Sequence, residues 1–321
     1  MNNLYIKEAK NPISDDMSVL KLWIEVARVK FFLAGIPSVI LGAVLALYWT
    51  GNFNPYNFVI SLVGVILAMI GTYTFNEYYD FKSGVDVVIP AEHITPFNAG
   101  SRVLPSGRLK PEPVFMLGLI SWILYIFIAV YFTFTVGWII IPLSLIGLIS
   151  GAFYTMPPFM WAYRGFGEFL IGLNYGPLIT FGSYYVQAMS LPIEFIALPS
   201  MIPALLITAV IWINEFPDYY ADRTVGKMNL VVRLGLERSR TVYYLLVSGV
   251  YLVLFLGILY NLIPLTGLIL LTTLPITYRN ILIVKKYYNV PRKLVSAMRG
   301  TILLFSSSTF LLALGYLLAL W

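Results

Sequence analysis

Cysteine is absent from the sequence, histidine occurs once, at His93, and charged residues are scarce. Without cysteine there is no disulfide framework, thiolate metal site or thiol nucleophile. We interpret His93 as a solvated loop residue rather than as a catalytic base. Only 11% of the 321 residues are charged and 59% are hydrophobic, which leaves too little polar surface to cover a water-soluble protein of this size. The chain is therefore predicted to be an integral membrane protein.

Nine apolar runs have about the 20 residues that a membrane-spanning helix needs. They cover residues 29–50, 57–79, 113–134, 137–155, 166–188, 193–215, 241–260, 262–284 and 299–320. The predicted fold is all-α, with nine transmembrane helices in one bundle and a cytoplasmic cap formed by the loops after the second and sixth spans. Residues 1–28 are predicted as a cytoplasmic N-terminal segment ahead of this domain at 29–321. Within and just beyond that segment, residues 17–30 resemble an amphipathic helix on the membrane surface.

The distribution of positive charge orients the predicted bundle. With nine spans, all 21 Lys and Arg residues fall on one face of the membrane, and such residues are retained on the cytoplasmic side. We expect the N-terminus and the two long loops, about 80–112 and 216–240, in the cytoplasm and the C-terminus outside a cell (plasma) membrane. The net charge of +6 then reflects contact with anionic lipid headgroups and not nucleic-acid binding.

Acidic side chains gather where the second and sixth apolar runs end. Asn76 and Asp80 are four residues apart and therefore share one face of a helix, and Asp86 follows. The second cluster, Asn214, Asp218 and Asp222, is spaced four and four and is predicted to form a single stripe. Pro217 lies inside it and should kink or end the sixth span, which we expect to aim the two aspartates into a cavity.

Four carboxylates brought together at a membrane edge repel one another, and a divalent cation relieves that repulsion. Carboxylate and amide oxygens suit Mg²⁺, which shares its coordination sphere with substrate phosphates. Basic residues follow the acids in both loops, so the pattern predicts a diphosphate site. One alternative is that charges cluster at helix ends only because water is there. Another is a metal-dependent transporter of a phosphorylated lipid, although acids at one membrane edge favour a cytoplasm-facing site over alternating access.

Three stretches carry a resemblance to a known family. NEYYDFKSGVD (76–86), YTMPPFMWAYRGFGEFLIGLNYGPL (154–178) and NEFPDYYADRTVGKMNLVVRLG (214–235) resemble motifs of the UbiA superfamily of membrane-embedded prenyltransferases. The resemblance covers roughly residues 25–320 and is nearest to the menaquinone (MenA-like) branch. The chain departs from the commoner pattern at Gly84, where many members have the second aspartate of the first motif, and at Phe216 and Pro217, where many have a polar or basic pair.

The resemblance implies a site and a reaction. Mg²⁺ is expected to be bound by Asp80, Asp86, Asp218 and Asp222, which form the catalytic set, with Asn76 and Asn214 completing or orienting the shell. The residues expected to contact the diphosphate are Arg102, Arg223 and Lys227. Tyr154 is the favoured aromatic contact to the carbocation, ahead of Tyr78, Tyr79, Tyr219 and Tyr220.

The reaction implied is transfer of a polyprenyl group from an isoprenyl diphosphate, such as geranylgeranyl diphosphate, to an aromatic acceptor. The favoured acceptor is 1,4-dihydroxy-2-naphthoate, as in menaquinone biosynthesis. Another aromatic acceptor, or a glycerol-phosphate lipid acceptor, remains open, because fold and motif leave the acceptor pocket free to vary. The lipid bilayer is the expected surrounding, and no obligate protein partner is inferred.

Overall fold

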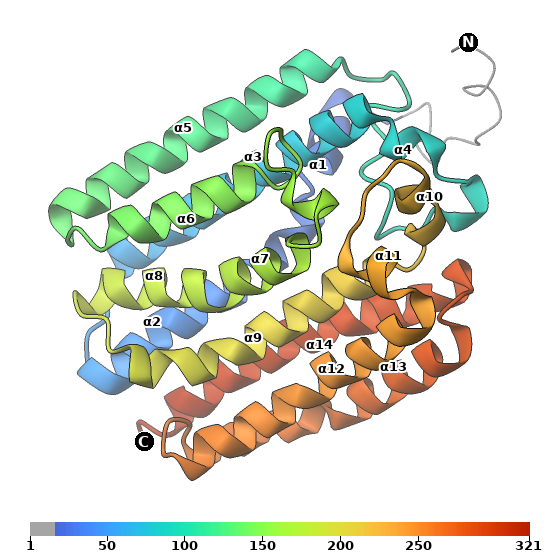
Figure 1. The fold of residues 1–321 in the computed structure, drawn as a ribbon. Helices are drawn as coiled ribbons and strands as arrows, with labels where there is room; N and C mark the ends of the chain where they lie inside the picture. The colour runs from blue at the N-terminus through green and yellow to red at the C-terminus, as the bar shows by residue number, and fades with distance from the viewer. Residues whose placement is uncertain (1–16) are drawn as a thin grey trace.

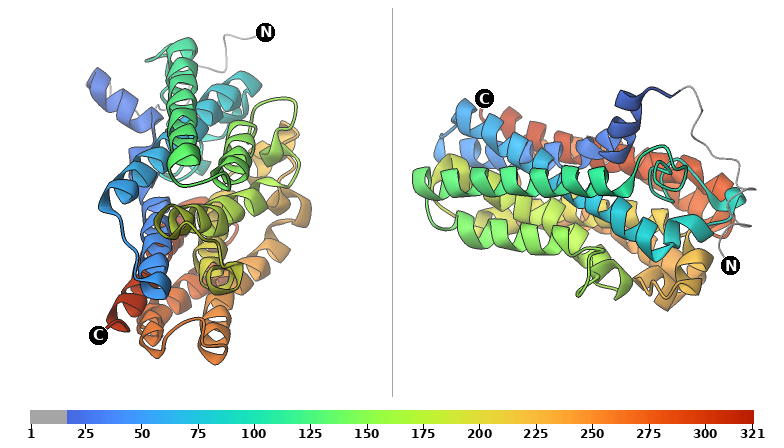
Figure 2. Two further views of the ribbon diagram at one scale, coloured as in Figure 1. Left: turned by 90° about the vertical axis from the view of Figure 1, so that its left-hand side faces the viewer. Right: turned by 90° about the horizontal axis from the view of Figure 1, so that it is seen from above.

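The computed structural model describes residues 17–321, and within them every regular element is a helix. The long helices run side by side as an elongated bundle, and the short helices and long loops gather at one of its ends (Figure 1). Figure 2 shows the same bundle nearly end-on and from above. Residues 1–16, the first part of the predicted N-terminal segment, lie outside the described residues.

Seven helical runs within residues 17–321 are long and apolar enough to cross a membrane. These runs are Val19–Thr50, Pro55–Ser83, Pro111–Thr135, Ile193–Asn214, Leu236–Leu259, Leu265–Tyr287 and Pro291–Leu318. Five of them are single helices, α3 (Pro55–Ser83), α5 (Pro111–Thr135), α9 (Ile193–Asn214), α12 (Leu236–Leu259) and α14 (Pro291–Leu318). A sixth joins the 3₁₀ segment η5 (Leu265–Thr273) to α13 (Leu274–Tyr287). All seven overlap apolar runs expected from the sequence.

The first run is not one regular helix. The amphipathic helix predicted over residues 17–30 is the shorter α1 (Val19–Val26), and it ends before Arg28, which has a left-handed conformation with φ of 50°. The chain continues through a 3₁₀ segment, η1 (Val29–Ala34), into α2 (Ile36–Thr50). Pro37 stands in the first turn of α2, where its fixed φ and missing N–H are tolerated.

The other two expected spans are short or interrupted. One is α6 (Ile140–Ala152), with 13 residues. The other is divided into α7 (Gly167–Leu173), a π-helical turn η4 (Asn174–Leu178) and α8 (Ile179–Ala188). Pro177 lies inside the π turn, and because proline lacks the N–H that an α-helix needs, the regular ladder breaks there.

Close approach between helices holds the bundle together. A Cβ on Gly42 of α2 would lie 2.4 Å from the carbonyl oxygen of Thr180 in α8, so only glycine allows these two backbones to pack so closely. Elsewhere in the bundle, pairs of hydroxyl groups tie α12 to its neighbours α14 and α13. Tyr243 and Thr301 are 2.7 Å apart through their oxygens, and Tyr251 and Thr277 are also 2.7 Å apart.

The loops after α3 and α9 lie together at the end of the bundle that carries the short helices (Figure 1). The first contains α4 (Val85–Val88) and the 3₁₀ turn η2 (Ala91–His93), and the second contains α10 (Tyr219–Thr224) and α11 (Leu230–Leu234). Ile89 and Ala99 of the first loop pack against Ala221 of the second. The helix α1 covers the first loop from outside, because Leu22 and Val26 pack against it.

Candidate active site

The two acidic motifs reach one polar cavity of about 690 Å³ at this end of the bundle. The first motif contributes from the end of α3 and from α4, and the second from the end of α9 and the turn that follows. The lining contains Asn76, Asp80, Asp86, Asn214, Asp218 and Lys227. Tyr154 lines it as well, so seven of the ten residues predicted for the site from the sequence line the same cavity.

A sharp turn at Gly84 brings Asp86 back to the cavity. The helix α3 ends at Ser83, and Gly84 has a φ of 82°, a left-handed conformation that glycine adopts without strain. The N–H of Gly84 donates to the carbonyl of Phe81 at 3.1 Å. Where the commoner motif has an aspartate, this chain thus has the residue that lets α4 return Asp86 toward Asp80.

The carboxylate of Asp80 is held by two donors from different parts of the chain. Asn76 Nδ2 donates to Asp80 Oδ2 at 2.6 Å, as the four-residue spacing predicted. The hydroxyl of Tyr163 donates to Asp80 Oδ1 at 2.9 Å. Tyr163 belongs to the segment between α6 and α7, and its role in the site was not predicted from the sequence.

The second motif is divided between two helices, so the expected single stripe is not continuous. The helix α9 ends at Asn214, three residues before Pro217, and Asp218 lies in the turn that leads into α10. Asn98 Nδ2 donates to Asp218 Oδ1 at 2.5 Å, and Asn229 Nδ2 donates to Asp222 Oδ2 at 2.8 Å. Asp222 is buried and does not line the cavity.

Lys227 joins the two motifs. Its Nζ lies 3.9 Å from Asp80 Oδ2 and 3.7 Å from Asp222 Oδ1. Burial alone lowers the pKa of Lys227, but Asp222 and Asp80 outweigh that effect and raise the pKa well above its ordinary value. The ammonium group therefore remains charged at physiological pH, at the point where the two acidic loops meet.

The surroundings of three aspartates disfavour their charged form. Burial, and then the charges of Asp80 and Glu77, raise the pKa of Asp86 well above its ordinary value. Burial and the neighbouring Asp222 raise the pKa of Asp218 to about 7. Burial raises the pKa of Asp222 to about 6, although Lys227 acts in the opposite direction. Opposite charge added to this cavity would stabilise all three carboxylates.

These residues fit a hard divalent cation by their chemistry. Asn214 Oδ1 and Asp222 Oδ1 are buried and have no hydrogen-bond partner among residues 17–321, and amide and carboxylate oxygens are Mg²⁺ ligands. In the described part of the chain no group of three or more His, Cys, Asp or Glu side chains converges closely enough to form a ligand cluster. Five of the six predicted donors, Asn76, Asp80, Asp86, Asn214 and Asp218, thus line one cavity, and Asp222 does not line it.

Two of the predicted basic residues lie elsewhere. Arg102 is buried, and its Nη1 donates to the backbone carbonyl of Asp86, so it supports the turn that carries that aspartate. Arg223 is exposed on α10. Among the described residues, neither lines the polar cavity. Loops bring residues together by tertiary contacts that spacing in the sequence does not encode.

An ion pair beside the cavity was not predicted from the sequence. Arg28 Nε and Nη2 donate to Glu77 Oε1 at 2.9 and 2.7 Å, and Ser101 donates to both carboxylate oxygens of Glu77 at 2.7 Å. This network joins the segment before η1, the end of α3 and the loop after α4. Gly100 packs so tightly here that a Cβ would lie 2.7 Å from Asp86 Oδ2. Glu77 adjoins Asn76 in the first motif, and only this position in the sequence indicated a role near the site.

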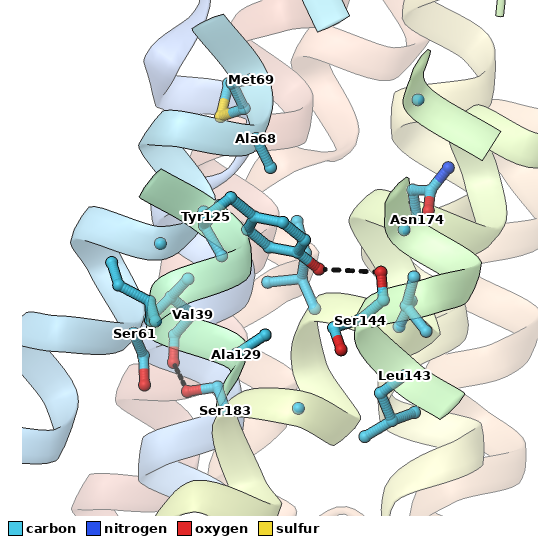
Figure 3. A pocket seen from close by; sticks show the side chains of 18 of the residues that line it. Val39, Ser61, Ala68, Met69, Tyr125, Ala129, Leu143, Ser144, Asn174 and Ser183 are labelled. Carbon is cyan, nitrogen blue, oxygen red and sulfur yellow. Dashed lines mark hydrogen bonds between the residues drawn. The ribbon is translucent and has the colours of Figure 1, made fainter. Parts of the chain in front are cut away.

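Two largely apolar cavities adjoin the polar one. A cavity of about 1050 Å³, shown in Figure 3, lies among α2, α3, α5, α6 and the segment from α7 to α8. A second, of about 850 Å³, lies among η1, α3, α9 and α14. We call them the long cavity and the side cavity. Tyr154 lines all three cavities and stands where they meet.

The other aromatic residues considered from the sequence lie apart from these three cavities. Tyr78 and Tyr79 pack against each other and against Phe115 of α5. Tyr220 is exposed and approaches His93, and its ring also contacts Tyr219. Within residues 17–321, Tyr154 alone of the five predicted aromatic contacts lines the polar cavity.

Comparison with known proteins identifies relatives over most of the chain. The sequence profile described as the UbiA prenyltransferase family matches residues 36–308. The 2-carboxy-1,4-naphthoquinone phytyltransferase of Synechocystis sp. is 24% identical over 92% of this chain and 93% of its own. The 1,4-dihydroxy-2-naphthoate octaprenyltransferase of Escherichia coli is 29% identical over 81% of this chain and 83% of its own.

The fold also has counterparts among solved structures. A UbiA homolog from Archaeoglobus fulgidus bound to GPP and Mg²⁺ superimposes with a TM-score of 0.62 at 17% identity, over 91% of this chain and 99% of its own. A UbiA homolog from Aeropyrum pernix, in its apo form, gives a TM-score of 0.61 at 14% identity, over 92% and 99% of the two chains.

Proposed function

This chain belongs to the UbiA prenyltransferase family and is a membrane-embedded prenyltransferase, and we propose that it transfers a polyprenyl group from an isoprenyl diphosphate to 1,4-dihydroxy-2-naphthoate. The observation that carries this proposal is the junction at Tyr154, which lines both a polar cavity rich in carboxylates and two apolar cavities. A donor with a charged head and a hydrocarbon tail matches that division.

The polar cavity binds the diphosphate. Asp80, Asp86, Asp218 and Asp222, with the amides of Asn76 and Asn214, would hold Mg²⁺, which when bound would stabilise the negative charge that develops on the departing diphosphate. Lys227 is the one predicted phosphate-binding residue that also lines this cavity, so we assign it the direct contact to the diphosphate oxygens.

The side cavity suits the aromatic acceptor. The rings of Phe31, Tyr73 and Tyr175 line it, and two cations, Arg28 and Lys30, stand where it meets the polar cavity. We assign the acceptor carboxylate to Lys30, because its ion pair with Glu25 is more exposed to solvent than the ion pair of Arg28 with the buried Glu77. The acceptor ring then lies at the junction, beside the carbon that loses the diphosphate.

The bonding changes balance within this arrangement. The C–O bond of the donor breaks, and the diphosphate leaves with the electron pair, which generates an allylic cation. The electron-rich ring attacks the cation through the carbon that bears the carboxylate, and the carboxylate departs as carbon dioxide. The apolar walls exclude water from the cation, and the ring of Tyr154 offers its π face at the junction.

The membrane setting completes the proposal. The seven spans identified by length, together with α6 and the interrupted α7–α8 segment, form a nine-span bundle in the plasma membrane, preceded by the cytoplasmic segment 1–28. The loops that carry the acidic motifs face the cytoplasm as its cap, and the C-terminus lies outside. On this arrangement α1 lies on the membrane surface, since its Val19, Leu20 and Ile24 are exposed.

An acceptor comparison with Lys30→Gln tests this function. We expect the purified protein to prenylate 1,4-dihydroxy-2-naphthoate with release of carbon dioxide. The variant should raise KM for this acceptor while leaving KM for 1,4-dihydroxynaphthalene, which has no carboxylate, unchanged. Prenylation of a glycerol-phosphate lipid or of another aromatic acid in preference to the naphthoate would reassign the acceptor. Uptake of a phosphorylated lipid into vesicles without any bond cleavage would instead support a transporter.

A further inference from the structure

The long cavity extends away from the polar cavity along two helices. On α3 it is lined from Thr72 to Ser61, and on α6 from Gly151 to Ile140. Each pair is separated by 11 positions, and at 1.5 Å per residue both helices give a length of about 16 Å. Two independent helices therefore define one elongated chamber whose near end is the Tyr154 junction.

The far end of this chamber is walled by a packed cluster. Phe132, Ile140 and Val186 line the cavity, and together with Tyr185 they form a buried hydrophobic group. A chain that enters at the junction and extends along the cavity meets this cluster after the full length.

Most polar side chains along the long cavity are engaged by the protein itself, although Trp122 Nε1 has no hydrogen-bond partner among residues 17–321. The hydroxyl of Tyr125 donates to the Ser144 carbonyl at 3.1 Å, and Ser183 donates to the Val39 carbonyl at 2.7 Å (Figure 3). Ser61 donates within its own helix, to the carbonyl of Asn57 at 2.7 Å. These groups are already satisfied, so an occupant gains little from hydrogen bonding, and a hydrocarbon is the chemistry that fits.

Gly182 is the unusual residue of the wall. It lies within α8 and lines the chamber, yet a Cβ added there would meet no described atom within 4 Å. By contrast, a Cβ on Gly176, six residues earlier, would lie 2.4 Å from Ala204 Cβ. Packing explains Gly176, whereas at Gly182 glycine keeps a volume empty even though alanine would favour the helix.

We propose that the long cavity measures the prenyl chain of the donor, with Gly182 as a specificity-determining position and the Phe132 cluster as the limit. This inference rests on the proposed function. A peptide chain advances about 3.3–3.6 Å for every three bonds. At that advance an isoprene unit, with four chain bonds, spans roughly 4.5 Å, so a 16 Å chamber accepts three to four units. With the first unit at the Tyr154 junction, three further units extend about 14 Å into the cavity, so the preferred donor is geranylgeranyl diphosphate, of four units.

The Gly182→Leu variant tests directly whether the long cavity limits the length of the prenyl chain. Position 182 is seven residues beyond Tyr175, or about 10 Å along the helix axis, so leucine there leaves space for about two isoprene units. We expect kcat/KM for geranylgeranyl diphosphate to fall at least about tenfold relative to geranyl diphosphate, since a filled apolar pocket discriminates at that level for even small excess groups. The Phe132→Ala variant should act in the opposite direction and improve the use of a five-unit donor.

The matched control is Gly249→Leu in α12. This residue lies outside the three cavities, and a Cβ there would contact only Leu205, at 3.5 Å. Its donor profile should equal that of the unmodified protein.

Three outcomes would contradict the proposal that the long cavity selects the prenyl chain length, while leaving the transferase activity intact. One is an unchanged donor profile in Gly182→Leu, and another is an equal loss with every donor. The third is equal use of four-unit and eight-unit donors by the unmodified protein. If Gly182→Leu does not fold, Phe132→Ala decides by itself. Absence of diphosphate release from any donor by the unmodified protein is a different result, because it contradicts the proposed function.

Discussion

Replacing Glu77 with glutamine tests whether its ion pair with Arg28 holds the acidic end of α3 in place. The Glu77 side chain has no solvent exposure and that of Arg28 has 20%. The carboxylate accepts from the guanidinium at 2.7 and 2.9 Å and from Ser101 at 2.7 Å. The substitution preserves the shape of the side chain, so its effect reports on charge and hydrogen bonding.

Removing one partner of a buried ion pair leaves the other charge uncompensated and costs about 3–5 kcal/mol. In a chain of this length, each kcal/mol lowers the melting temperature by roughly 2 °C. Glu77→Gln should therefore melt about 6–10 °C below the unmodified protein. Arg28→Gln should behave similarly. The double variant should lose less than the sum of the two, because it contains no unpaired buried charge.

The assay is thermal unfolding of the detergent-solubilised protein, measured for the four members of this double-mutant cycle. A melting temperature within about 2 °C of the unmodified protein for Glu77→Gln would show that the ion pair does not hold the end of α3 in place. So would a double variant whose loss equals the sum of the single losses, because additivity is expected only of residues that do not interact.

Two further predictions concern the polar cavity. Gly100→Ala should reduce turnover far more than Gly107→Ala. Both glycines have a positive φ, 65° and 72°, but only a Cβ at position 100 would meet the carboxylate of Asp86; equal steady-state rates for the two variants would contradict this. Mg²⁺ affinity should fall as the pH drops below about 7, because Asp218 and Asp222, with pKa values raised to about 7 and about 6 in the metal-free protein, must lose protons before they bind metal. Since both pKa values are raised on folding, the metal-free protein should lose stability as the pH rises from about 4 to about 7. Calorimetric titration with Mg²⁺ in buffers of different ionisation enthalpy measures the proton release, and an affinity independent of pH over this range would contradict the expectation.

The fold was largely predictable because a membrane imposes length and apolarity on each span. All nine expected apolar runs overlap helical segments, although only seven runs within residues 17–321 reach the length of a span by themselves. The π turn over Asn174–Leu178 was not predicted, since Pro177 stands in a run whose apolar character continues on both sides. Proline in a membrane helix is tolerated where neighbours supply the missing contacts, and composition does not reveal them.

The site was predictable where it depends on local spacing. Asn76 and Asp80 contact each other because four residues make one helical turn. The same rule was wrong across residues 214–222, because α9 ends at Asn214 and the chain turns before Asp218. Contacts between distant segments, such as Tyr163 with Asp80, depend on how the loops pack, which spacing does not determine.

The most direct test of the central claim is product formation by the purified protein from geranylgeranyl diphosphate and 1,4-dihydroxy-2-naphthoate, with and without Mg²⁺, beside Asp80→Ala and Asp218→Ala. We expect a prenylated, decarboxylated naphthalene diol that requires Mg²⁺ and disappears in both variants, because Asp80 and Asp218 each contribute a carboxylate to the cavity that both motifs line. Product formation that persists without divalent metal, or that both variants sustain at the unmodified rate, would contradict it.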